Sequence, residues 1–238
     1  MLADDITIDD DTLQRAKQQH NSTALYDIGN VYYQRGRVMG DYVTALKYFE
    51  IAAFKNNVKA QDKAGSMYCW GNGVEADYTK AVQWYLLAAD QGYSKAQYHI
   101  GWMYQYGKGV LQDNKKAYVW FLKSAVQGNK HAQYSLGYFH LYGLSVPMRY
   151  QIAFQWFLKA GHQEHRMAQY WLGHMYCNKE GVELNKQASL EWYFRAANNG
   201  SWEALDEYNK LYMEGYRLSP KLNRETSYGI FIDILSFI

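Results

Sequence analysis

Residues 96–128 read AQYHIGWMYQYGKGVLQDNKKAYVWFLKSAVQG, and residues 60–92 read AQDKAGSMYCWGNGVEADYTKAVQWYLLAADQG. The two stretches begin 36 residues apart and share most of their small and aromatic positions. Self-similarity at a fixed period of about 20–50 residues is typical of solenoids and other arrays of small structural units. The fold class therefore depends on how far this period extends along the chain.

The period extends over most of the 238 residues. The first half of each unit carries an alanine, then a glycine, then usually a tyrosine, and the second half carries a large aromatic residue between two small ones. The alanines that open the units are Ala24, Ala60, Ala96, Ala132, Ala168 and Ala204. The glycines are Gly29, Gly65, Gly101, Gly137 and Gly173, with Asn209 in the sixth copy. The large aromatic residues of the second half are Tyr48, Trp84, Trp120, Trp156 and Trp192.

These columns predict six units and a partial one. We expect a partial repeat or cap over 1–23, followed by units at 24–59, 60–95, 96–131, 132–167, 168–203 and 204–238. The first unit is divergent, and the last is divergent or truncated. The cap is expected to hold one helix, from about Asp9 to His20, with the polar outer face that a terminal repeat needs. Near the other end Tyr228 takes the tryptophan place, and the apolar tail 229–238 is either a divergent last helix or the sign of a longer array.

The pattern of each unit predicts two helices, because its apolar and small residues recur with a helical period. A glycine inside a helix costs about 1 kcal/mol relative to alanine, so the glycine column indicates helices that approach too closely for a side chain. The tryptophan column is expected to place rings between units, so that Trp120→Ala would cost about 3–5 kcal/mol. Between the helices a glycine turn of the GxGV type precedes Asp77, Asp113 and Asn185, which are expected to cap the second helix. The predicted fold is an all-α, right-handed superhelical solenoid of antiparallel helix pairs with essentially no strand.

The chain resembles the Sel1-like repeat family, whose consensus is roughly A-x-x-x-L-G-x-x-Y, a G-x-G-V turn, and then D-x-x-K-A-x-x-W-x-x-x-A-A-x-x-G. The resemblance covers residues 24–200 strongly. Tetratricopeptide repeats are the nearest alternative, but their period is about 34 residues and they lack the GxGV turn. The resemblance implies a protein-binding array with roles such as assembling signalling complexes, activating a fungal cell-wall synthase or serving in endoplasmic-reticulum degradation, and the sequence selects none of these.

Composition and charge exclude several other classes of function. The formal net charge is only +2 and no basic stripe is visible, which argues against a nucleic-acid partner. No stretch approaches the ~18 consecutive apolar residues that a membrane span needs, and the start lacks the features of a signal peptide. The chain as given is therefore expected in the cytoplasm or nucleus, as a monomer that binds a protein or peptide. Cys69 and Cys177 occupy the same column three units apart, so both thiols are expected to be free.

In stacked helix pairs the first helices usually line the concave face, where partners bind. Three variable columns of the first helix fall on one side by helical spacing and are expected to face this groove. Its middle is aromatic and rich in histidine, and its ends are polar, as in protein interfaces. The candidate partner-binding residues are Trp70, His99, Trp102, Tyr106, Tyr138, Tyr142, Trp171 and His174. The alternative is that Trp102, Tyr138 and Trp171 are packing residues at the edge of the core.

No catalytic signature occurs in the sequence, and neither an enzyme nor a cofactor is expected. His162 and His165, three residues apart without a third ligand, are interpreted as a solvated helix end rather than a metal site. A Helicobacter branch of the family is linked with penicillin binding, but this chain has neither S-x-x-K nor that branch's cysteine pairs. We therefore predict a non-enzymatic adaptor or scaffold. The alternatives are a regulatory segment of a multidomain protein and a hydrolase of the cysteine-rich branch.

Overall fold

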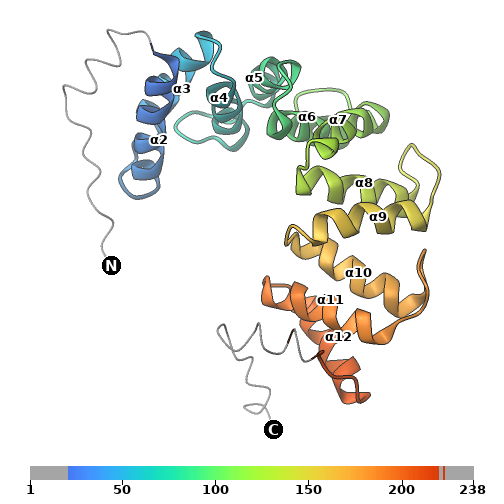
Figure 1. Ribbon diagram of the computed structural model, residues 1–238. Coiled ribbons are helices and arrows are strands. Elements are labelled where there is room, and N and C mark those ends of the chain that lie inside the picture. The colour runs from blue at the N-terminus through green and yellow to red at the C-terminus, as the bar shows by residue number, and fades with distance from the viewer. Residues whose placement is uncertain (1–20, 220–221, 223–238) are drawn as a thin grey trace. The chain divides into compact units, whose positions relative to one another are not determined.

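The computed structural model describes residues 21–219 and 222. These residues form eleven helices and no strand, with short connections between consecutive helices (Figure 1). The helices are α2 (Ser22–Met39), α3 (Tyr42–Phe54), α4 (Val58–Trp70), α5 (Tyr78–Asp90), α6 (Ser94–Tyr106), α7 (Asn114–Val126), α8 (Lys130–Tyr142), α9 (Tyr150–Gly161), α10 (Arg166–Asn178), α11 (Lys186–Asn198) and α12 (Trp202–Met213). The expected helix from Asp9 to His20, Tyr228 and the tail 229–238 lie outside the described residues.

The helix pairs repeat with the predicted period. First helices begin at Val58, Ser94, Lys130, Arg166 and Trp202, which are 36 residues apart, and second helices from α5 to α11 keep the same spacing. The chain divides into two compact units, residues 1–124 and 125–238. Within the second unit each helix from α8 to α12 packs against the next. The predicted fold class, an all-α solenoid of antiparallel helix pairs, is confirmed.

The helix ends follow the local chemistry that the sequence predicts. The carboxylate of Asp77 accepts a hydrogen bond from the backbone N–H of Lys80 at 2.9 Å, and Asp113 and Asn185 cap α7 and α11 in the same way. The first helices end in a left-handed residue, a glycine in most units and Lys179 at the end of α10 (φ 60°). Glycine adopts this left-handed conformation without strain, which explains why it occupies the position in most units.

The glycine column is explained by aromatic rings that lie directly against the helix. A side chain at Gly101 would place its Cβ atom 2.6 Å from the ring of Phe121. The rings that meet the glycine column are Phe49, Tyr85, Phe121, Phe157 and Tyr193. All five are buried, whereas Trp120 is half-buried against the core, with the Lys123 ammonium 4.1 Å from its ring centroid. The ring that meets the glycine therefore belongs to the residue after the tryptophan, which the sequence columns did not indicate.

Replacing Gly101 with alanine is expected to lower the free energy of unfolding by about 1–2 kcal/mol. The gain in helix propensity is about 1 kcal/mol, and overpacking against Phe121 typically costs more than this. Urea unfolding followed by circular dichroism measures the change. In a Phe121→Leu background the same substitution should cost less, since leucine can vacate the space. Strict additivity of the two substitutions would show that Gly101 and Phe121 are not coupled.

A column of buried glutamines joins each helix pair to the next. Gln61 donates from Nε2 to the carbonyl oxygen of Ala53 at the end of α3, at 3.3 Å, and its Oε1 accepts from Gln91 Nε2 at 2.8 Å. Gln133 and Gln169, two and three repeats further on, make the equivalent pair of bonds. Each glutamine thereby gives a C-terminal helix carbonyl a second donor, besides the backbone N–H of the turn that follows the helix.

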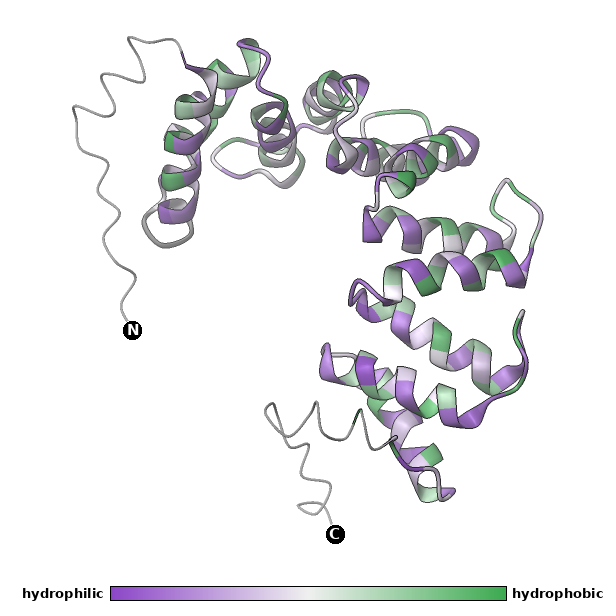
Figure 2. Cartoon of the chain, in the orientation of Figure 1, coloured by the Kyte–Doolittle hydropathy of each residue, from purple (hydrophilic) through white to green (hydrophobic). Residues whose placement is uncertain are grey.

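The described helices carry hydrophobic and hydrophilic residues together along their length (Figure 2). None of them is long and apolar enough to cross a membrane. Cys69 is buried, Cys177 is half-buried, and both are free thiols.

Candidate functional site

The first of the two compact units, residues 1–124, presents a cluster of aromatic rings on α4 and α6. The ring centroids of Trp70 on α4 and Trp102 on α6 are 6.1 Å apart, and those of Trp102 and Tyr106 are 5.2 Å apart. Trp70 is 64% exposed and Tyr106 is 55% exposed, whereas Trp102 is half-buried against the core. We call these three residues the first aromatic patch. Two of its rings are open to solvent, and the third anchors them to the packed interior.

His99 has surroundings that the sequence columns do not indicate. Its Nδ1 atom lies 2.9 Å from the Oδ1 atom of Asp62, a carboxylate that is itself buried. The His99 ring also lies against Tyr85, with 4.6 Å between the ring centroids. The His99 ring is thus held between a carboxylate and an aromatic face.

The second compact unit, residues 125–238, presents a similar cluster on α8 and α10. The ring centroids of Tyr138 and Tyr142 are 4.5 Å apart, those of Tyr142 and Trp171 are 6.1 Å apart, and those of Trp171 and His174 are 5.3 Å apart. Tyr142 is 50% exposed. Trp171 also stacks on the buried ring of Phe157, at 6.2 Å with nearly parallel planes. We call Tyr138, Tyr142, Trp171 and His174 the second aromatic patch.

A carboxylate borders the second aromatic patch. Glu180 follows α10, and its Oε2 atom lies 3.3 Å from His174 Nδ1 without hydrogen-bond geometry. Burial raises the pKa of the Tyr142 hydroxyl, and the neighbouring Tyr138 and the negative charge of Glu180 raise it further. Tyr142 therefore remains a neutral hydroxyl in a field that favours positive charge.

The His162–His165 segment is only partly the solvated helix end that the sequence suggests. His162 is exposed, but His165 is half-buried and caps α10, with its Nδ1 atom accepting the backbone N–H of Ala168 at 3.3 Å. The His165 ring stacks on Tyr134 at 4.6 Å and meets His131 edge-on at 5.1 Å. Burial, together with the nearby His131 and Lys130, lowers the pKa of His165 to about 4. His165 is therefore a structural cap.

The described residues contain no group of three or more histidine, cysteine, aspartate and glutamate side chains placed to hold a metal ion. The residues that sequence reasoning missed are Asp62 and Glu180, which lie outside the three variable columns. Asp62 is one residue before the first of those columns, and Glu180 lies on the turn after the helix.

Five consecutive stretches of the chain match the sequence model of the family described as Sel1 repeat. The matched residues are 22–57, 58–93, 94–129, 130–165 and 166–201. Each match begins two residues before the corresponding unit defined above from its opening alanine. A comparison with curated proteins gave no match.

Solved structures similar to this chain include repeat proteins of the same kind. A protective antigen of uropathogenic Escherichia coli, described as displaying an SLR fold, is 31% identical with a TM-score of 0.78 over 89% of this chain and 46% of the antigen. A Sel1 repeat protein from Oxalobacter formigenes is 28% identical with a TM-score of 0.78 over 87% of this chain and 85% of that protein. An immunity protein from Pseudomonas aeruginosa, 20% identical with a TM-score of 0.55 over 86% and 78%, shares the fold alone.

The chain therefore spans less than half the length of the Escherichia coli antigen and most of the Oxalobacter protein. Together the repeat matches cover residues 22–201 without a gap, and they coincide with helix pairs of the described structure. The chain belongs to the Sel1 repeat family, whose members generally mediate interactions between proteins and are generally not catalytic.

Proposed function

We propose that this protein is a non-enzymatic adaptor that holds a partner protein or peptide on the aromatic patches of its first helices. The observation that carries the proposal is the exposure of Trp70, Tyr106 and Tyr142, which lie at the ends of three first helices and are each at least half open to solvent. Aromatic residues are enriched in protein interfaces, where burial of a large ring gives much of the binding energy.

The way these rings are anchored supports a binding role. Trp102 and Trp171 pack against the core, and each contacts an exposed ring, Tyr106 in the first patch and Tyr142 in the second. The exposed rings are therefore already ordered before a partner arrives, which lowers the entropy cost of binding. In helical repeat arrays the extended concave surface serves as the binding surface.

Truncating the exposed rings is expected to weaken partner capture without unfolding the array. Trp70→Ala, Tyr106→Ala and Tyr142→Ala should each reduce affinity by about 1–3 kcal/mol where the ring is buried by the partner. The measurement is affinity capture from an extract of the protein's own cells with quantitative mass spectrometry, followed by titration of the partner found.

Phe54→Ala is the matched control. Phe54 is 79% exposed and also aromatic, but it lies on the second helix α3 and packs against Trp84. Capture should survive this substitution, and melting curves should show every variant folded. If Phe54→Ala abolished capture and the three patch variants did not, the partner would bind the second helices, and the proposed site would be refuted.

The proposal keeps two further expectations, that the adaptor is a monomer and that it acts in the cytoplasm. Light scattering coupled to size exclusion tests the first, and imaging of a tagged chain tests the second.

A further inference from the structure

The two aromatic patches differ in the charged residue that follows one of their helices. Lys108 follows α6, which carries Trp102 and Tyr106, and Glu180 takes the equivalent position after α10, which carries Trp171 and His174. Similar rings are thus combined with a different charge.

The negative charge beside the second aromatic patch is incompletely neutralised. Lys210 pairs with two carboxylates at once, at 2.8 Å from Glu207 Oε1 and 3.0 Å from Asp206 Oδ2. Glu203 accepts a hydrogen bond from the neutral hydroxyl of Ser201 at 2.9 Å. Among the described residues, no lysine or arginine forms an ion pair with Glu180 or Glu203.

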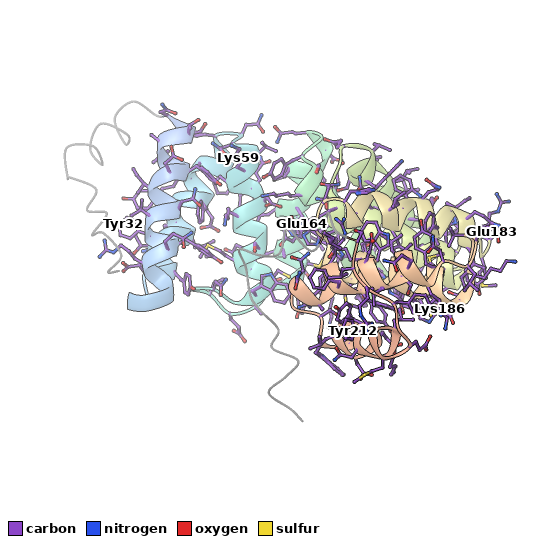
Figure 3. The ribbon with its side chains drawn as sticks, turned by 60° about the horizontal axis from the view of Figure 1, so that its bottom comes forward. Tyr32, Lys59, Glu164, Glu183, Lys186 and Tyr212 are labelled. Carbon is purple, nitrogen blue, oxygen red and sulfur yellow. The ribbon has the colours of Figure 1, made fainter. Side chains whose placement is uncertain are left out.

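The basic side chains of this region are engaged elsewhere. Lys186 pairs with Glu214 at 2.7 Å, and Lys179 pairs with Glu183 at 3.6 Å. Figure 3 shows Glu183 and Lys186 at the connection between α10 and α11, with Tyr212 on the neighbouring α12. The Arg166 guanidinium donates to the carbonyl oxygen of Gly200 at 3.2 Å. Burial raises the pKa of Tyr170, and the negative charges of Glu207 and Glu203 raise it further. The field of these carboxylates therefore reaches the rings, since Tyr170 contacts Trp171.

We infer that the second aromatic patch binds a basic segment of the partner protein. An arginine or lysine of that segment stacks on Tyr142 and Trp171 and pairs with Glu180. A cation over an aromatic face is attracted by the ring, and a carboxylate within reach adds a charge-assisted hydrogen bond. The inference rests on the proposed adaptor function and narrows the partner to a class. The first aromatic patch has Lys108 at the sequence position equivalent to Glu180 and is not assigned a basic ligand.

A phage-displayed library of random linear peptides, selected against the full chain, supplies the probe. Enriched peptides are expected to carry arginine or lysine next to apolar residues. The most enriched peptide is synthesised with a fluorescent label and titrated by fluorescence polarisation. Its affinity should fall as salt is raised, because partly exposed charges are screened.

Variants of the chain then place the peptide. Tyr142→Ala should weaken binding about tenfold or more, and Glu180→Gln about three- to tenfold. Glu180→Lys, which copies the charge of Lys108, should weaken binding more than Glu180→Gln does. Phe54→Ala is the control, because Phe54 is an exposed aromatic residue of a second helix and lies outside both patches. It should leave the affinity unchanged. Glu180 lies on a turn, so its variants test the site even if a ring variant unfolds.

Two negative results have different meanings. Peptides that need Tyr142 but carry no basic residue and ignore Glu180→Gln would overturn the basic-segment inference and leave the adaptor function standing. Peptides that bind every variant equally, with Trp70→Ala and Tyr106→Ala included, would overturn both. Basic peptides that depend on Tyr106 rather than Tyr142 would overturn the assignment to the second patch.

Discussion

Phe121→Ala is expected to lower the free energy of unfolding by about 3–5 kcal/mol, the usual cost of deleting a fully buried aromatic ring. Phe121 has no exposed surface, and its ring fills the space that Gly101 leaves open on the facing helix. The side chain also lies 5.8 Å from Tyr98, measured between ring centroids. Truncation leaves a cavity between α6 and α7 that a glycine cannot fill. Urea unfolding followed by circular dichroism gives the change.

The neighbouring Trp120→Ala provides the comparison. Trp120 is only half-buried, with the Lys123 ammonium over its ring, so its truncation should cost about 1–2 kcal/mol. The order of the two effects tests the packing directly. If Trp120→Ala destabilised the chain more than Phe121→Ala, the tryptophan would be the interior ring and the glycine column would need another explanation.

The second large effect is a loss of stability in acid that comes from His165. Its pKa is about 4 in the folded chain, against about 6.5 for an unperturbed histidine. Between these two values the unfolded chain binds a proton that the folded chain does not, so stability falls as pH decreases from about 6.5 toward 4. The expected loss from this group is about 2–3 kcal/mol. A protonated ring could no longer accept the Ala168 N–H, and its charge would oppose the helix N-terminus.

His165→Asn is the variant that isolates this contribution. Asparagine already caps the equivalent helices at Asn57 and Asn129, so the cap is kept while the titrating group is removed. Unfolding free energies measured from pH 7 to pH 4 should fall less steeply in this variant than in the wild type. His162→Asn, which removes the exposed histidine of the same segment, is the matched control. Equal slopes in the wild type and His165→Asn would rule His165 out as the cause.

The helix pairs, their caps and their glycine turns could be predicted because each rests on local chemistry that recurs in every unit. Asp77, for example, follows a GxGV turn and precedes a helical pattern, and aspartate is a preferred N-cap residue at such a position. The partner of the glycine column was not predicted, because two aromatic residues stand side by side in the second helix. Helical periodicity separates the faces of a helix but does not say which of two adjacent residues meets the neighbouring helix. The crossing of α6 and α7 selects Phe121 over Trp120.

The candidate site was predictable where it depends on helical spacing and not where it depends on tertiary contacts. The sequence columns grouped Trp70, Trp102 and Tyr106. In the structure the ring centroid of Trp102 lies 6.1 Å from that of Trp70 and 5.2 Å from that of Tyr106. Asp62 was overlooked because an isolated aspartate in a first helix looks like a solvated residue, and only the fold shows it buried against His99. The different charges of the two patches likewise depend on turn residues that lie outside the helical pattern.

The glutamine column has a consequence for how proteins of this kind can change in length. Gln97 donates to Ala89 as Gln133 does to Ala125, so removal of residues 94–129 would offer Gln133 the Ala89 carbonyl in place of its own. A one-residue insertion or deletion inside a helix, by contrast, turns the rest of that helix by about 100° and carries a glutamine amide away from its acceptor. The same hydrogen bonds are therefore kept when a whole repeat is gained or lost and broken when a helix changes by a single residue. Evolution can lengthen the repeat array in whole steps while leaving each junction chemically unaltered.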